Sequence, residues 1–448
     1  MKKLIYLLPL ALILIGFWGC EKESYVAKFD KLPQERMKAQ IDSVKNILTS
    51  ADNGWIGTLP TAQGGGYAFY MQFDKEGYVN MVADLTDQTA TKVKKSEYRI
   101  RQDMGAALTF GTYTYISILN NPDTSAFHSP DVGKGFKSDI NFIYDHSSED
   151  SMVFIGKRYR QPFSLVKATA AQKDKYMNGG YLTAIDKWKT YFINHPNLYF
   201  DYNNDLKVSV EANSGNSMNA GKRITFTALY GKDSIASVTQ LFAFTVDQMA
   251  ILHGGLEFDG ISFVKIAWKD ANTLALYDNT GKEYVLKNSP TPLLPLYMLW
   301  GTKYNGMLSD YMQIYPGTSD KGADILSFYH QNLCGYLRYC FDRGRLEFVW
   351  DIINHRLSLK GIEEQTSNGG SWTTTVTFNY TVDDNGVYTF TLRDDFDGGY
   401  VGDIMIPLKD FLLNNKVKFD YYVDGADVYG AMESVDDPSI AMTFVLQK

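Results

Sequence analysis

The chain has 448 residues, a formal net charge of −7, 45% hydrophobic residues and 21% charged residues. This balance is ordinary for a globular protein with a sizeable core, and the length predicts two or three domains. No long basic run occurs in the sequence, which argues against nucleic acid as a partner.

The first residues form the pattern of a secretory signal. Two lysines precede an apolar run of 16 residues, from Leu4 to Gly19, and the sequence turns polar directly after Cys20. A membrane-spanning helix needs about 20 apolar residues. We therefore favour a cleaved signal peptide, residues 1–19, over an uncleaved membrane anchor.

The end of this run, Phe17-Trp18-Gly19-Cys20, resembles a bacterial lipobox. In that motif the cysteine receives a diacylglyceryl group, the leader is cut just before it, and the new amine is acylated. Two or more acyl chains give stable membrane anchoring, so a lipidated Cys20 is the expected link to the membrane. The alternative for Cys20 is a free thiol in an uncleaved leader.

Residues 20–29 are expected to form a tether. Its charged start, Glu21-Lys22-Glu23, resembles the tethers that send Bacteroidota-type lipoproteins to the outer face of the outer membrane. The alternative is a solvated linker with no targeting role. The expected location is therefore the outer membrane, where the lipid-anchored protein faces the cell exterior.

Residues 30–169 are expected to form a helix followed by an antiparallel β unit. Met37, Ile41, Val44 and Leu48 recur at helical spacing. A hairpin follows, in which two apolar runs are joined by a turn of Asp, Lys, Glu and Gly. The predicted strands are Tyr67–Phe73, Tyr78–Ala83, Glu97–Arg101, Leu108–Ile118, Ile140–Tyr144, Met152–Ile155 and Phe163–Val166.

Residues 170–289 are expected to repeat this scheme. A helical stretch from Ala171 to Ile193 is broken at Asn178-Gly179-Gly180 and stopped by His195-Pro196. The predicted strands are Leu206–Val210, Ile224–Tyr230, Val238–Thr245, Ile261–Trp268, Leu274–Tyr277 and Tyr284–Leu286.

Residues 290–448 are expected to form a Pro-rich boundary and a C-terminal α+β unit. Pro290, Pro292 and Pro295 cannot all sit inside a helix or a central strand. Apolar residues between Asp324 and Tyr339 predict a third helix. The remaining predicted elements are the strands Leu346–Trp350, Leu357–Ile362, Trp372–Val382, Val387–Leu392, Phe419–Val423 and Ala441–Leu446 and a short helix, Pro407–Leu413.

Together these patterns predict an α+β, β-dominated fold. It consists of antiparallel meander sheets or barrel-like units, each preceded by a helix. A structural repeat, present two or three times, is one explanation of the likeness between these units, and β patterning alone is the alternative. Aromatic residues make up 14% of the chain, with 31 Tyr. Packing within β-sheets is the favoured explanation for them, and exposed rings that stack on sugars are the alternative.

Two cysteines remain besides Cys20, namely Cys334 and Cys340. Residues six apart point to different sides of a helix and lie about 20 Å apart on a strand, so a disulfide would need a turn between them. No turn is evident there, and we expect two small buried thiols. His330 and Cys334 share a helix face, but zinc needs three or four ligands, so packing into the core is favoured over metal binding.

Common catalytic motifs are absent from the sequence. The sequence has no Gly-x-Ser-x-Gly, no phosphate loop and no helical His-Glu-x-x-His. From Asp383 to Asp437 there are 13 acidic and four basic residues, and a carboxylate pair among them could serve a glycosidase. The segment Asp394–Gly399 is similar to a calcium loop but lacks the later Glu, so a turn is favoured. We assign no catalytic residue, no metal and no cofactor.

The layout resembles an uncharacterised family of Bacteroidota lipoproteins. The matching features are the lipobox, Asn53-Gly54-Trp55 at the end of the first helix, Gly66-Tyr67, the run Phe73 to Val82, and Leu108-Thr109-Phe110-Gly111-Thr112-Tyr113. The resemblance covers nearly the whole mature chain. It implies a surface accessory role near SusC/SusD-type outer-membrane uptake systems and a zinc-dependent lipoprotein. Cys20 is the one functional residue that it carries over.

The favoured function is a non-catalytic binding or accessory component of a nutrient uptake system for glycans or glycopeptides. Its expected partners are the membrane, through Cys20, a porin-like or SusD-like outer-membrane protein, and a glycan ligand. The alternatives are a carboxylate-dependent, glycosidase-like hydrolase and a structural subunit of an uptake complex.

Overall fold

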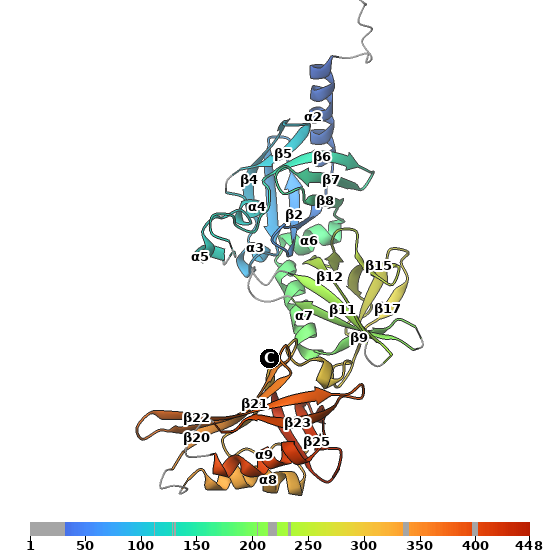
Figure 1. The fold of residues 1–448 in the computed structure, drawn as a ribbon. Coiled ribbons are helices and arrows are strands. Elements are labelled where there is room, and N and C mark those ends of the chain that lie inside the picture. Colours follow the sequence, from blue (N-terminus) through green and yellow to red (C-terminus); the bar gives the residue numbers. More distant parts are fainter. Residues whose placement is uncertain are drawn as a thin grey trace, which may run out of the picture.

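The computed structural model describes residues 32–111, 113–127, 129, 131–203, 205–213, 222–231, 234–334, 340–396 and 402–448. Residues 1–31 lie outside these ranges. They include the predicted signal peptide (1–19), Cys20 and the predicted tether (20–29). The predicted fold class is confirmed, because three antiparallel, barrel-like β units follow one another along the chain (Figure 1). None of the described helices is both long enough and apolar enough to span a bilayer.

The first barrel is a closed, eight-stranded antiparallel barrel in which each strand pairs with its neighbour in sequence. β1 closes the barrel against β8, for example through Ile56 and Val166. Its strands are β1 (Trp55–Pro60), β2 (Gly66–Phe73), β3 (Tyr78–Ala83), β4 (Lys94–Gln102), β5 (Ala106–Phe110), β6 (Asn141–Ser147), β7 (Ser151–Gly156) and β8 (Pro162–Lys167). Its helices are α2 (Pro33–Thr49), α3 (Asp87–Thr91), α4 (Tyr115–Ile118) and α5 (Thr124–Phe127).

Aromatic side chains fill the first barrel. Phe142 and Phe163 have ring centroids 4.9 Å apart, and Phe69 and Phe110 pack edge-on against Phe163. An eight-stranded barrel is just wide enough for side chains to fill its interior, so this barrel is a packed core.

Helix α2 is joined to the first barrel through its apolar face. Val44 and Leu48 are buried there, and the Trp55 indole N–H donates a hydrogen bond of 2.8 Å to the Leu48 carbonyl. The chain then turns at Gly54, whose φ of +73° suits glycine. The helix predicted from Met37 to Leu48 is confirmed.

The predicted strand Leu108–Ile118 is wrong in its second half. β5 ends at Phe110, and Tyr115–Ile118 forms the short helix α4. The reason is a capping interaction, because the Thr114 hydroxyl accepts a hydrogen bond of 3.2 Å from the Ser117 N–H.

The second sheet is antiparallel and has ten strands. Residues 283–288 join its two edges. Within this segment β17 (Glu283–Val285) pairs with β16 at one edge and β18 (Lys287–Asn288) pairs with β9 at the other, so the sheet curls into a barrel-like unit. Its strands are β9 (Leu198–Asp201), β10 (Lys207–Asn213), β11 (Arg223–Tyr230), β12 (Ser234–Phe244), β13 (Gln248–Ile251), β14 (Leu256–Phe258), β15 (Ile261–Trp268), β16 (Leu274–Asp278), β17 (Glu283–Val285) and β18 (Lys287–Asn288).

Two helices precede the second sheet, α6 (Ala170–Met177) and α7 (Gly180–Asn194). The predicted break between them is confirmed, since Gly179 has a φ of +80°. Trp188 of α7 is buried against Trp268 of β15, with ring centroids 5.1 Å apart.

The third barrel is a closed, eight-stranded antiparallel barrel in which β19 pairs with β26. Its strands are β19 (Gly306–Asp310), β20 (Arg343–Asp351), β21 (Arg356–Gln365), β22 (Gly370–Val382), β23 (Val387–Asp394), β24 (Val417–Asp424), β25 (Asp427–Ser434) and β26 (Ala441–Gln447). Its helices are η2 (Leu296–Met298), α8 (Asp320–Asn332), η4 (Asp403–Met405) and α9 (Ile406–Asn414). The helices α8 and α9 lie together at the end of the molecule far from α2 (Figure 1).

The expectation of two buried thiols in the third barrel is wrong. Cys334 and Cys340 form a disulfide, with their Cα atoms 3.7 Å apart, and both residues are exposed. The prediction assumed one continuous helix from Asp324 to Tyr339. Helix α8 instead ends at Asn332, and the two cysteines face each other across an isolated antiparallel bridge.

Candidate ligand-binding site

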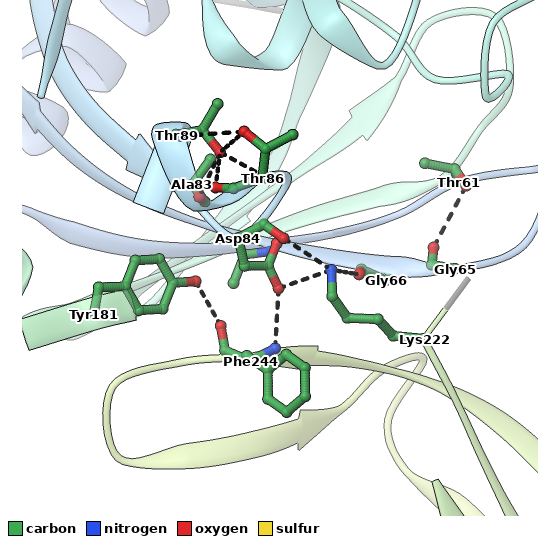
Figure 2. A network of polar contacts seen from close by, with 11 residues as sticks. Thr61, Gly65, Gly66, Ala83, Asp84, Thr86, Thr89, Tyr181, Lys222 and Phe244 are labelled. Atoms are coloured by element: carbon green, nitrogen blue, oxygen red, sulfur yellow. Dashed lines mark hydrogen bonds and ion pairs between the residues drawn. The ribbon is translucent and has the colours of Figure 1, made fainter. Parts of the chain in front are cut away.

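The first barrel and the second sheet are joined by a buried ion pair. Asp84 follows β3 and Lys222 precedes β11, and the Lys222 ammonium lies 3.0 Å from the Asp84 carboxylate (Figure 2). The Asp84 side chain is fully buried, and that of Lys222 is 12% exposed. Near this pair, a Cβ atom on Gly66 of β2 would lie 2.3 Å from the Phe242 carbonyl of β12, so the two units meet at backbone distance.

Every polar atom of this ion pair has a partner. The Asp84 carboxylate accepts hydrogen bonds from the N–H groups of Ala68 in the first barrel and Phe244 in the second sheet, at 2.8 and 3.1 Å. The Lys222 ammonium also donates to the carbonyls of Gly66 and Asp84, at 3.1 and 3.3 Å. An ammonium has three donors, so all three are used.

The electrostatics of this pair fit a structural role. Burial raises the pKa of the Asp84 carboxyl, and the positive charge of Lys222 opposes that shift. Burial likewise lowers the pKa of Lys222, against the charge of Asp84. Because both groups are enclosed and fully hydrogen-bonded, they join two units rather than meet a substrate.

A second junction, between the second sheet and the third barrel, has a different character. The two are connected by the Pro-rich residues 290–295, which we call the linker. At its start the Asn197 amide donates to the carbonyls of Ser289 and Pro290, each at 3.3 Å. At its end the Tyr421 hydroxyl donates to the Leu294 carbonyl at 3.0 Å. The linker is thus held by both units.

One side of the linker borders a pocket of about 520 Å³, which we call the hydroxyl pocket. The wall that the second sheet provides comes from the outer face of β10, β11 and β12. Cross-strand register aligns Ser209 with Thr227 and Thr227 with Ser237, and the Thr227 and Ser237 hydroxyls are 3.1 Å apart. Residues that alternate along a strand share a face, so the next row, Glu211 and Thr225, lies on the same wall.

The opposite wall of the hydroxyl pocket is aliphatic. It comes from the linker and the turn of helix that follows, and it is formed by Pro292, Leu293, Leu294, Met298 and Leu299. An ion pair joins the two walls, because the Lys303 ammonium lies 2.7 Å from the Glu211 carboxylate. The pocket therefore offers hydroxyl donors and acceptors on one side and apolar contact on the other.

Comparison with known protein families matches residues 27–270 to the family described as Domain of unknown function (DUF4302). The match covers more than half of the chain. The chain belongs to the DUF4302 family. Searches of curated proteins and of solved structures found no match.

The DUF4302 region contains the first barrel and most of the second sheet. Asp84, Lys222 and the hydroxyl wall of the pocket all lie inside it, whereas the linker and the third barrel follow it. The family domain therefore includes the ion-pair junction and supplies one wall of the pocket.

The two metal-ligand candidates from the sequence, His330 and Cys334, are not part of a metal site in the portion of the chain that the structure describes. Cys334 is held in the disulfide, and His330 is 5% exposed. Burial lowers the pKa of His330 to about 4. Within the described ranges no three His, Cys, Asp or Glu side chains lie together where they could hold a metal ion. The zinc dependence implied by the resemblance thus has no ligand set among these residues.

The acidic stretch from Asp383 to Asp437 is spread over several surfaces. Asp437 pairs with Lys321 at 2.8 Å, and hydrogen bonds from Lys321 and Ser439 lower the pKa of Asp437 to about 2. Asp395 pairs with Lys409 at 3.0 Å, and the rest of the predicted turn, from Asp397 to Gly399, lies outside the described residues.

Most of the aromatic side chains in the described chain serve packing, as favoured from the sequence. Five are among the exposed large hydrophobic residues: Tyr78, Tyr113, Tyr230, Phe328 and Tyr422. Sequence reasoning missed the hydroxyl pocket. Its residues come from three strands and the linker, and no local motif marks them.

Proposed function

We propose that this protein is a lipid-anchored, surface-exposed lipoprotein of the outer membrane that binds a glycan or glycopeptide for a nutrient uptake system. The hydroxyl pocket is the observation that carries the proposal. Its volume of about 520 Å³ lies in the range of small-molecule sites.

The two walls of the pocket match the chemistry of a sugar ring. A sugar has hydroxyl groups along its edges and an apolar C–H face. The Ser209, Thr227 and Ser237 hydroxyls can donate and accept hydrogen bonds, although the contact between Thr227 and Ser237 uses one of their donors. The aliphatic wall contributes contact with the C–H face. A binding role needs no further reactive group in this pocket.

The position of the pocket suits a tethered binding protein. The segment that carries Cys20 precedes α2, which lies at one end of the molecule, while the third barrel lies at the other (Figure 1). Anchoring at Cys20 would leave the pocket away from the membrane. The disulfide between Cys334 and Cys340 also supports an extracytoplasmic location, because disulfides persist in oxidising compartments.

The anchor itself can be tested by metabolic labelling with a radioactive lipid precursor. We expect the native chain to incorporate label and Cys20→Ala to incorporate none, because only a thiol at that position accepts the diacylglyceryl group. Cys334→Ser with Cys340→Ser is the matched control, since it changes cysteines far from the lipobox. Normal labelling of Cys20→Ala would contradict the proposed anchor.

The binding role can be tested with a glycan array and the full chain, solubilised in detergent. We expect binding to at least one oligosaccharide. For that sugar, Thr227→Val with Ser237→Ala should weaken binding by about thirtyfold, because two hydroxyl hydrogen bonds worth about 1 kcal/mol each are lost.

The matched control is Thr381→Val, which removes an exposed hydroxyl from the outer face of β22 in the third barrel. It should bind as the native chain does. Equal affinities for the pocket variant and the native chain, or binding to no glycan on the array, would contradict the proposed site.

A second candidate function is a carboxylate-dependent hydrolase. The observation that favours it is that Asp384 and Asp420, from the acidic stretch, line a common pocket beside the linker. Incubation with the bound oligosaccharide and assay for new reducing ends distinguishes the two functions. A hydrolase would release reducing ends at a rate that falls in Asp384→Ala, whereas a binding protein would leave the sugar intact.

A further inference from the structure

The linker also lines a second pocket, which we call the carboxylate pocket. It measures about 560 Å³, and it shares Pro292, Leu293 and Leu294 with the hydroxyl pocket. Both pockets also border the hairpin formed by β11 and β12, through Leu229 in one case and Ile235 in the other. Two neighbouring cavities of similar size therefore share the linker as a common wall.

The polar groups of the carboxylate pocket are exposed to solvent. Asp384 lies in the turn between β22 and β23, and Lys418 and Asp420 lie on one face of β24. The Lys418 ammonium is 3.5 Å from the Asp420 carboxylate, and both side chains are about half exposed. Two carboxylates and one ammonium leave a net negative charge, which disfavours anionic ligands such as uronic acids and favours neutral sugars.

Aromatic rings complete this pocket. Tyr297 lies over Gly386, where a Cβ atom would be 2.4 Å from its ring. Tyr421 is fixed by the hydrogen bond from its hydroxyl to Leu294. Aromatic faces beside carboxylate acceptors suit a ring with an apolar face and hydroxyl edges, since carboxylates accept hydrogen bonds from hydroxyl groups.

We infer that the two pockets are subsites for one ligand, a linear neutral oligosaccharide that crosses the linker. This inference rests on the proposed function. The linker residues between the pockets are only partly buried, so a sugar chain can lie over them. A ligand that fills both pockets gains affinity, because once one part of it is bound, the other part is held close to the second pocket at a high effective concentration.

The test is the dependence of affinity on chain length. The full chain is titrated calorimetrically with a size series of the best array sugar, from disaccharide to octasaccharide. We expect the octasaccharide to bind roughly tenfold or more tightly than the disaccharide. Asp384→Ala with Asp420→Ala should abolish this gain, so that the octasaccharide binds no more tightly than the disaccharide does.

The matched control is Asp424→Ala with Asp427→Ala, which removes two exposed carboxylates from the hairpin between β24 and β25, outside both pockets. It should retain the gain. Affinity that does not change with length, or a gain that survives in the Asp384 and Asp420 variant, overturns the inference while the proposed function stands. Failure to bind any sugar would instead overturn the proposed function.

Discussion

Replacing Asp84 with alanine is expected to lower the free energy of unfolding by about 3–5 kcal/mol, because it leaves the Lys222 charge buried without a partner. It also removes the acceptor of the Ala68 and Phe244 N–H groups, which belong to different units. Urea denaturation gives the change in stability. Hydrogen exchange should show that these two amides lose protection together.

The matched control for this prediction is an exposed ion pair. The Lys287 ammonium lies close to the Asp201 carboxylate, but both side chains are more than 40% exposed. Asp201→Ala should therefore cost about 1 kcal/mol or less. If Asp84→Ala behaved in the same way, with both amides still protected, Asp84 would not join the first barrel to the second sheet.

Replacing Glu363 with glutamine is expected to stabilise the third barrel at neutral pH. Glu363 lies inside the barrel with no exposed surface, and one of its carboxylate oxygens accepts a hydrogen bond of 3.1 Å from the Tyr329 hydroxyl. The other carboxylate oxygen has no protein partner. Burial raises the pKa of Glu363 to about 8, so the folded protein holds this side chain in its neutral form at pH 7.

The pH dependence of stability follows from the protonation of Glu363 in the folded and in the unfolded chain. An unfolded glutamate titrates near pH ~4.3. Between that pH and about pH 8 the folded chain therefore binds a proton that the unfolded chain releases. The contribution of Glu363 to stability is full below the unfolded pKa and is lost as pH rises, by about 1.4 kcal/mol per pH unit. At pH 7 the loss reaches roughly 4 kcal/mol.

Glu363→Gln removes this titration and keeps an acceptor for Tyr329. Its stability advantage over the native chain should grow between about pH 5 and pH 8 and level off above that. Urea midpoints at several pH values measure it. Glu364→Gln is the control, because the next residue along β21 points to the other face of the strand. Parallel pH profiles for the native chain and Glu363→Gln would show that Glu363 is ionised in the fold.

The elements that the sequence predicted well are those governed by local rules. The hairpin of β2 and β3 was predicted because two apolar runs are joined by a turn that ends in Gly77, whose φ is +96°. The break between α6 and α7 was predicted from Gly179 for the same reason. Strands β13 and β14 were missed because they have only four and three residues, too few to show a clear alternation of apolar and polar side chains.

The candidate site depends on the pairing register of β10, β11 and β12, and this register cannot be read from the sequence. Ser209, Thr227 and Ser237 are ordinary polar residues on three strands, and only the pairing of β10, β11 and β12 places them in one row. Asp84 and Lys222 are 138 residues apart, and their pairing depends on how two units dock. The disulfide was missed for a related reason, because the helix before it ends earlier than its apolar pattern indicates.

Sugar binding in the hydroxyl pocket is the basis of the proposed function. Its most direct test is a crystal structure of the full chain soaked with the tightest-binding oligosaccharide from the array. We expect a sugar ring between the Ser209, Thr227 and Ser237 hydroxyls and the aliphatic wall at Leu293. A sugar bound elsewhere on the protein, with this pocket filled only by water, would contradict it.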